Sequence, residues 1–310
     1  MTVRRAALFS PLLAALLAAA CASGGEPPPP ALTPVLELPE DRRDLLVAYG
    51  EDGPEWARLR EEVKRDPERA RWLCQNLVLE LFRAYDSARI AQIGEQRGPF
   101  ERARDELCFF EDAAVPVLVD LLAARDGVVP VVSADLLRRI GAPALGPVTA
   151  TLDHADPRAR RAAAELLADL PHADAQEEAL EQRLGGLAAQ DPDWIVRAQA
   201  ARSLGERGAG HRTTETARAL LQPVLTDVDP AVAREAAAAL LLLGDPAAVP
   251  ALMNYLERSA RANDPRSAEA AQDALQALTG ADGPRDARAW RDLWRDRRGE
   301  LLEGPPDRPY

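Results

Sequence analysis

Histidines and aspartates at short spacing are the residues of this chain best suited to bind a metal ion. One residue separates His154 from Asp156, and one separates His172 from Asp174, while His211 stands apart. A structural zinc ion takes four nitrogen or sulfur ligands, and the cysteines lie elsewhere in the sequence. We therefore expect turns and helix caps at these positions, with no metal and no cofactor.

Two acidic pairs, Asp191 with Asp193 and Asp227 with Asp229, could offer carboxylate ligands to calcium. Neither is surrounded by a glycine-hinged calcium loop. Aspartate is also a common helix cap, because its side chain accepts a hydrogen bond from a free backbone N–H, and we expect that role here. The chain has no P-loop, no GxSxG elbow and no HExxH motif, so we predict no catalytic residue.

The first 20 residues are predicted to be a targeting segment. Two arginines precede an apolar run, Ala6–Ala20, that is too short to span a bilayer. The run ends in LAAAC, which resembles the lipobox of bacterial lipoproteins and implies cleavage before Cys21 and lipidation of that residue. Ala22 after the cysteine implies the outer membrane, facing the periplasm. An ordinary signal peptide in which Cys21 is incidental is the alternative.

The remaining chain divides into four predicted parts. Residues 21–40 are rich in proline and form an extended tether. Residues 41–100 form an irregular helical cap or degenerate repeat, with a long helix that starts at Asp66-Pro67 and carries leucines four residues apart. Residues 101–280 hold the repeats. Residues 281–310 form a capping helix, with Trp290 and Trp294 on one face, and a tail.

An internal repeat sets the architecture. Asp-Pro pairs recur at Asp156, Asp191, Asp229 and Asp264, spaced by 35, 38 and 35 residues. An alanine followed by a leucine four positions later recurs behind each pair: Ala163 and Leu167, Ala200 and Leu204, Ala236 and Leu240, Ala271 and Leu275. Two helices in such a period indicate an all-α solenoid of stacked antiparallel helix pairs.

The repeat resembles the HEAT family in its short bacterial form. Residues 191–205 match D-x-D-x-x-V-R-x-x-A-A-x-x-L-G position by position, and Gly244–Leu252 is similar to the family's turn and second helix. Ala233 and Ala268 stand in place of the arginine in the later copies. The resemblance covers about residues 95–280 and implies a HEAT-like superhelix that serves as a scaffold. It says little about a specific function.

The net charge of the chain indicates which kinds of partner it can bind. The chain has 38 basic and 50 acidic residues, a net charge of −12, which disfavours nucleic acid or an anionic membrane surface as the main partner. An unidentified protein with a basic patch fits better. Two internal cysteines, Cys74 and Cys108, lie on predicted helices among apolar residues; buried thiols and a disulfide both remain open.

The resemblance also suggests a binding face, because second helices line the concave surface of HEAT arrays. Acidic residues including Glu177 open one predicted second helix, and such a cluster is usually a solvated face. The candidate partner-binding residues lie off the leucine stripes of the second helices: Glu178, Glu181, Arg218, Gln222, Tyr255 and Arg258.

The sequence thus predicts a non-catalytic protein-binding scaffold or adaptor of the bacterial cell envelope, tethered to the membrane by Cys21. Two alternatives stay open. One is a structural spacer with no specific ligand. The other is a lyase-like enzyme or an enzyme subunit, which needs a pocket with convergent polar groups.

Overall fold

The structure is a computed structural model that describes residues 39–91, 98–210, 214–281 and 286–303. The described residues form helices and turns, without strands, as predicted for an all-α solenoid. Contacts divide the chain into two compact units, residues 1–147 and 148–310. The lipidation candidate Cys21 and the tether before residue 39 lie outside the described residues. Across the described helices, none is long and apolar enough to cross a membrane.

The first unit is built on a long helix. Leu73, Leu77 and Leu81 of this helix are buried, as their spacing predicted. The indole of Trp56 donates a hydrogen bond of 2.9 Å to the buried Glu106. The elements of this unit, with α8 crossing its end, are α2 (Glu40–Glu51), α3 (Pro54–Lys64), α4 (Pro67–Ala91), α5 (Pro99–Phe109), α6 (Glu111–Asp120), η2 (Leu121–Ala123), α7 (Val129–Ile140), η3 (Ala142–Ala144) and α8 (Leu145–Thr151).

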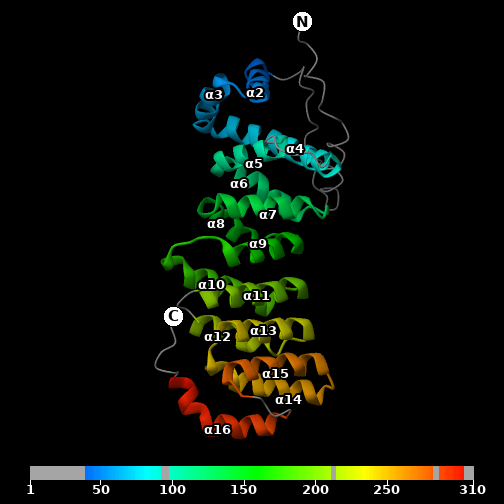
Figure 1. The fold of residues 1–310 in the computed structure, drawn as a ribbon, viewed down its shortest axis with the longest axis vertical. Helices are drawn as coiled ribbons and strands as arrows, with labels where there is room; N and C mark the ends of the chain where they lie inside the picture. Colours follow the sequence, from blue (N-terminus) through cyan, green and yellow to red (C-terminus); the bar gives the residue numbers. More distant parts are fainter. Residues whose placement is uncertain (1–38, 92–97, 211–213, 282–285, 304–310) are drawn as a thin grey trace. The chain divides into compact units, whose positions relative to one another are not determined.

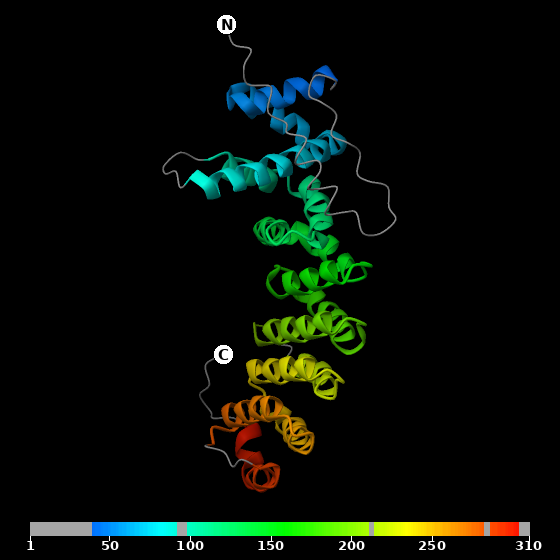
Figure 2. The same cartoon turned by 90° about the vertical axis from the view of Figure 1, so that its right-hand side faces the viewer.

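The second unit holds four successive helix pairs, which follow one another in chain order (Figures 1 and 2). The first helices of the pairs, α9, α11, α13 and α15, pack side by side. The elements are α9 (Pro157–Asp169), α10 (Asp174–Gln190), α11 (Trp194–Gly210), α12 (Thr214–Val224), α13 (Pro230–Leu243), η4 (Pro246–Ala248), α14 (Val249–Arg261), α15 (Pro265–Thr279) and α16 (Ala287–Glu303).

The alanine and leucine columns form the core of this second unit. Ala163, Ala200, Ala236 and Ala271 are fully buried, and so are the leucines four positions after them. Small side chains let the first helices approach closely. A methyl group on Gly205 of α11 would lie only 2.5 Å from Cβ and 2.7 Å from Cα of Ala239 on α13.

Aspartate caps begin the first helices, as predicted. Asp156, Asp229 and Asp264 each accept a hydrogen bond from a backbone N–H of the first turn. In the second copy the capping residue is Asp193, which accepts a hydrogen bond from the Ile195 N–H at 2.8 Å. Here α11 begins at Trp194, whereas the other first helices begin at the proline of their Asp-Pro pair. Gly244 ends α13 in the left-handed conformation, at φ 68°.

The last helix covers one side of the final repeat. Trp290 of α16 is completely buried, and α16 packs against α14. The Arg291 guanidinium forms an ion pair with Glu257 of α14, and Arg297 reaches the Thr279 carbonyl at 3.5 Å. The contacts are those of a helix that covers apolar surface left by the repeat before it.

Candidate partner-binding surface

Arginine–aspartate pairs join successive repeats. Arg160 of α9 reaches both carboxylate oxygens of Asp191 at 2.8 Å, and Arg197 of α11 reaches those of Asp227 at 2.7 and 3.0 Å. Each aspartate precedes the next first helix, and each also accepts a backbone N–H from the residue two positions later. Each acidic pair therefore has two roles: its first aspartate binds the preceding repeat, and its second caps the helix that follows.

The environment of these aspartates favours their charged form. Burial opposes ionisation and is the largest single influence on each carboxyl. It is outweighed by hydrogen bonds from the arginine side chain and the backbone N–H, together with the arginine charge. The pKa values of Asp191 and Asp227 are consequently lowered from the ordinary aspartate value.

The later repeat keeps an arginine at a shifted position. In the sequence, Ala233 stands at the position where the repeat pattern has an arginine. In the structure Arg234, one residue later, takes this place, with its guanidinium 3.9 Å from Asp264 and 3.5 Å from the Ser267 hydroxyl. These distances are longer than in the two pairs before it, so this contact holds its repeats less firmly.

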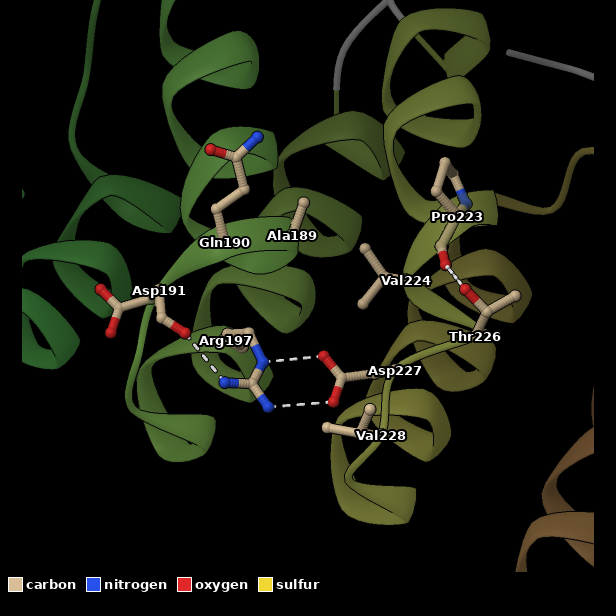
Figure 3. Close-up of a pocket in the computed structure, with 9 residues that line it drawn as sticks. All are labelled: Ala189, Gln190, Asp191, Arg197, Pro223, Val224, Thr226, Asp227 and Val228. Carbon is tan, nitrogen blue, oxygen red and sulfur yellow. Dashed lines mark hydrogen bonds and ion pairs between the residues drawn. The ribbon is translucent and has the colours of Figure 1, made fainter.

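An open groove of about 470 Å³ lies beside the second of these pairs (Figure 3). The Arg197 side chain crosses it to Asp227 and also donates to the Asp191 carbonyl at 2.8 Å (Figure 3). All three guanidinium nitrogens are thus engaged. The residues that line the groove come from the ends of α10 and α12 and from the starts of the following repeats: Ala189, Gln190, Asp191, Arg197, Pro223, Val224, Thr226, Asp227 and Val228.

Exposed apolar side chains belong to this groove or lie within three residues of its lining residue Arg197. Val228, in the turn before α13, is 95% exposed. Trp194 and Ile195, at the start of α11, are 46% and 41% exposed. Sequence reasoning missed these three residues, although a tryptophan beside a helix cap is a signal that could have found them. We call the groove with these three side chains the edge surface.

The predicted acidic face on α10 is only partly exposed. Glu178 is exposed, whereas Glu181 is fully buried, so the expectation that both carboxylates face solvent is wrong for Glu181. α10 packs against α11 here, and Arg207 of α11 is itself buried. Arg207 forms an ion pair of 2.8 Å with Glu177 and donates to the Leu167 carbonyl, and His172 contacts the same glutamate. This face of α10 therefore packs against α11 around a buried cation.

Most other second-helix candidates make contacts within the array. Arg218 of α12 binds Asp245 at 2.5 Å, and Gln222 reaches the Ala247 carbonyl at 3.5 Å, so both hold the turn of the following repeat. The Tyr255 side chain is buried. Arg258 donates to the Leu225 carbonyl and lies over the Tyr255 ring at 5.4 Å. Glu178 and the exposed part of Arg258 are the members of the set that stay accessible to a partner.

The histidines with a described position serve turns and packing. His154 accepts a hydrogen bond of 2.9 Å from the Asp156 backbone N–H, which confirms the predicted turn. His172 lies against Glu177, a contact that the sequence did not suggest. His211 lies outside the described residues. Among the residues with a described position, no three histidine, cysteine or acidic side chains gather as metal ligands would.

Both internal cysteines are free thiols in the structure. Cys74 is buried among the leucines of α4, and this burial raises the pKa of its thiol to about 12. Cys108 of α5 is half-buried, and burial raises its pKa as well. A thiol that resists ionisation is a poor nucleophile, so Cys74 is a packing residue.

One protein family and several solved structures are similar to this chain. Residues 178–279 match the family model of HEAT repeats. An engineered protein of known crystal structure is similar at 19% identity, over 80% of this chain and 74% of its own, with a TM-score of 0.41. A second similar structure, at 17% identity, is that of Kap95p with RanGDP. In it, Kap95p binding induces the switch loops of RanGDP to adopt the GTP-bound conformation. That match covers 88% of this chain and 35% of the other, with a TM-score of 0.46. No curated protein matches the sequence. The match over residues 178–279 agrees with the repeat pattern and the helix pairs, and it identifies this part of the chain as HEAT repeats.

Proposed function

We propose that this chain is a non-catalytic protein-binding scaffold of the bacterial cell envelope, tethered to the membrane by a lipid on Cys21. The observation that carries the binding role is the edge surface. Val228 lines an open groove of about 470 Å³, and Trp194 and Ile195 lie three and two residues before Arg197, which also lines it; all three apolar side chains are exposed. Exposed apolar side chains that cluster beside a groove mark sites of protein association.

The framework beneath the edge surface supports this role. The Arg197–Asp227 pair fixes the turn that carries Val228 against the helix that carries Trp194. Aspartate caps hold both helix starts. A preformed surface loses less conformational entropy on binding than a mobile one, which favours association.

The envelope location rests on the sequence before residue 39. The apolar run that ends in LAAAC supports cleavage and lipidation at Cys21. The proline-rich stretch that follows would hold the repeats away from the membrane, since polyproline segments extend by about 3.1 Å per residue. We place the protein at the outer membrane, facing the periplasm, where its partner would be another envelope protein.

Quantitative affinity capture tests the binding role. Envelopes of the source bacterium are solubilised in detergent and passed over the full repeat region, with the wild type and Val228→Asp compared in parallel. Because residue 228 is almost fully exposed, the substitution leaves folding intact and places a charge in the edge surface. We expect at least one envelope protein to bind the wild type and to be lost with Val228→Asp.

A matched control separates the edge surface from surface charge in general. Leu302→Asp introduces the same charge at an exposed leucine of α16, far along the chain. Captured proteins should be retained by this variant. If wild type, Val228→Asp and Leu302→Asp all capture the same proteins in the same amounts, the edge surface has no specific partner.

A further inference from the structure

A second groove lies between two first helices, away from the edge surface. Its volume is about 220 Å³, and its residues come from α11 and α13 alone: Arg202, Glu206, Glu235, Ala238, Ala239, Leu241 and Leu242. We call it the helix groove. Neither the repeat consensus nor the second-helix hypothesis pointed to it, because it lies on the first helices.

Small residues create the helix groove. Gly205 and Ala239 bring the two helices into such close contact that a methyl group added to Gly205 would lie 2.5 Å from the Ala239 side chain. Side chains this short cannot fill the surface above the contact. Leu242 remains 52% exposed at the groove, and Leu241 is half-buried. An apolar side chain of a partner could cover these leucines and remove their surface from water.

The helix groove carries more negative than positive charge, with Glu206 and Glu235 against Arg202 alone. Arg202 binds both carboxylate oxygens of Glu235, at 3.1 and 3.2 Å. Glu206, one turn after Arg202, forms neither a hydrogen bond nor an ion pair with any described residue. Burial raises the pKa of Glu206, and the carboxylates of Asp169, Glu165 and Glu235 add to the effect against the charge of Arg202. A cation placed beside Glu206 would relieve this excess of negative charge.

We infer that the helix groove binds a cationic, amphipathic segment of a partner protein, with an arginine or lysine of the partner against Glu206 and an apolar side chain against Leu242. Charge complementarity selects this occupant over an acidic or purely apolar one. The helix groove and the edge surface share no lining residue. One surface can therefore fail its test while the other passes.

Peptide titration tests the inference directly. The probe is a synthetic helical peptide with arginine and leucine on one face, and its counterpart carries glutamate in place of each arginine. Binding to the full-length protein is followed by fluorescence anisotropy. We expect the arginine peptide to bind and the glutamate peptide not to bind. Glu206→Gln and Leu242→Ser should each weaken binding about 10-fold, the loss typical of one charge-assisted contact or one buried leucine.

Two control variants distinguish the groove from the acidity of the whole chain. Glu61→Gln removes the same charge from an exposed position of α3, and Leu302→Ser removes an exposed leucine of α16. Each should change affinity by less than about 2-fold, since surface charges beyond the Debye length are screened. Equal losses for Glu206→Gln and Glu61→Gln, or no binding of the arginine peptide at millimolar concentration, would overturn the inference. A thermal melt of Glu206→Gln as high as that of the wild type verifies that the fold is intact.

Discussion

The guanidinium of Arg197 holds both carboxylate oxygens of Asp227, 30 residues further along the chain, at 2.7 and 3.0 Å. Arg160 and Asp191 repeat the same relationship one repeat earlier. Each pair joins a first helix to the turn that precedes the next first helix. The turns that carry the edge surface are therefore positioned by bonds between repeats and not by local chain geometry alone.

Removal of one arginine should destabilise the array. Both side chains of the Arg197–Asp227 pair are at most 12% exposed, so Arg197→Met would leave a poorly hydrated carboxylate without its cation. We expect a loss of about 2 kcal/mol or more in the free energy of unfolding, measured by urea denaturation. Arg295→Met, which breaks an exposed pair with Asp292, is the control and should cost less than about 0.5 kcal/mol. Equal costs for the two variants would show that the inter-repeat pair is dispensable.

Acid should weaken the same pairs. The pKa values of Asp191 and Asp227 are lowered in the folded chain, where burial is outweighed by the bonds from Arg160 and Arg197. Their stabilisation is therefore fully present above the ordinary aspartate pKa of 3.8 and is lost as pH falls through the lowered folded values. Thermal melts between about pH 7 and pH 3 should show a steeper fall in Tm for the wild type than for Asp227→Asn. Parallel curves would contradict this linkage.

The close contact between α11 and α13 at Gly205 leaves no room for a side chain, so substitution of this glycine should be destabilising. A methyl group there meets both Cα and Cβ of Ala239, so Gly205→Ala must push α11 and α13 apart. We expect a destabilisation of about 1–3 kcal/mol despite the better helix propensity of alanine. Gly186→Ala in α10 is the matched control, since nothing lies within 4 Å of the added carbon, and it should raise stability by up to about 1 kcal/mol. If Gly205→Ala also stabilises, the helices are not in close contact.

Lipidation at Cys21 is tested by mass. The native protein should begin at Cys21 and carry several acyl chains, which together hold it in the membrane fraction more firmly than one chain can. Cys21→Ser should abolish both the added mass and the membrane association. A native protein that is cleaved at another position, or cleaved before Cys21 without added lipid mass, would contradict the lipid anchor at Cys21.

Sequence reasoning succeeded where the signal is local. The buried columns through Ala200 and Leu204 follow from helical periodicity, and the caps at Asp193 and Asp229 follow from the needs of a helix start. Gly244 ends α13 because its backbone adopts the left-handed conformation. Each of these features depends on residues within about one turn of each other, so the pattern of a single repeat is sufficient to predict them.

Sequence reasoning failed where the environment comes from a neighbouring helix. Glu181 lies off the leucine stripe of α10 and was expected at the surface, but α10 packs against α11 and Glu181 is fully buried. Arg218 was also expected to face a partner, yet it binds Asp245 of the next repeat. The position of a residue on its own helix does not reveal whether that face meets solvent or another repeat, and the pattern of one helix therefore could not separate these cases.

Site-specific photo-crosslinking in living cells tests the central claim, that this chain is a protein-binding scaffold, most directly. A photoreactive phenylalanine analogue replaces Trp194 at the edge surface, and in a control strain it replaces the exposed Leu302 of α16. The account predicts a crosslinked envelope protein at position 194 that is absent at position 302 and disappears when Val228→Asp is added. No crosslink at position 194, or the same pattern at both positions, would contradict it.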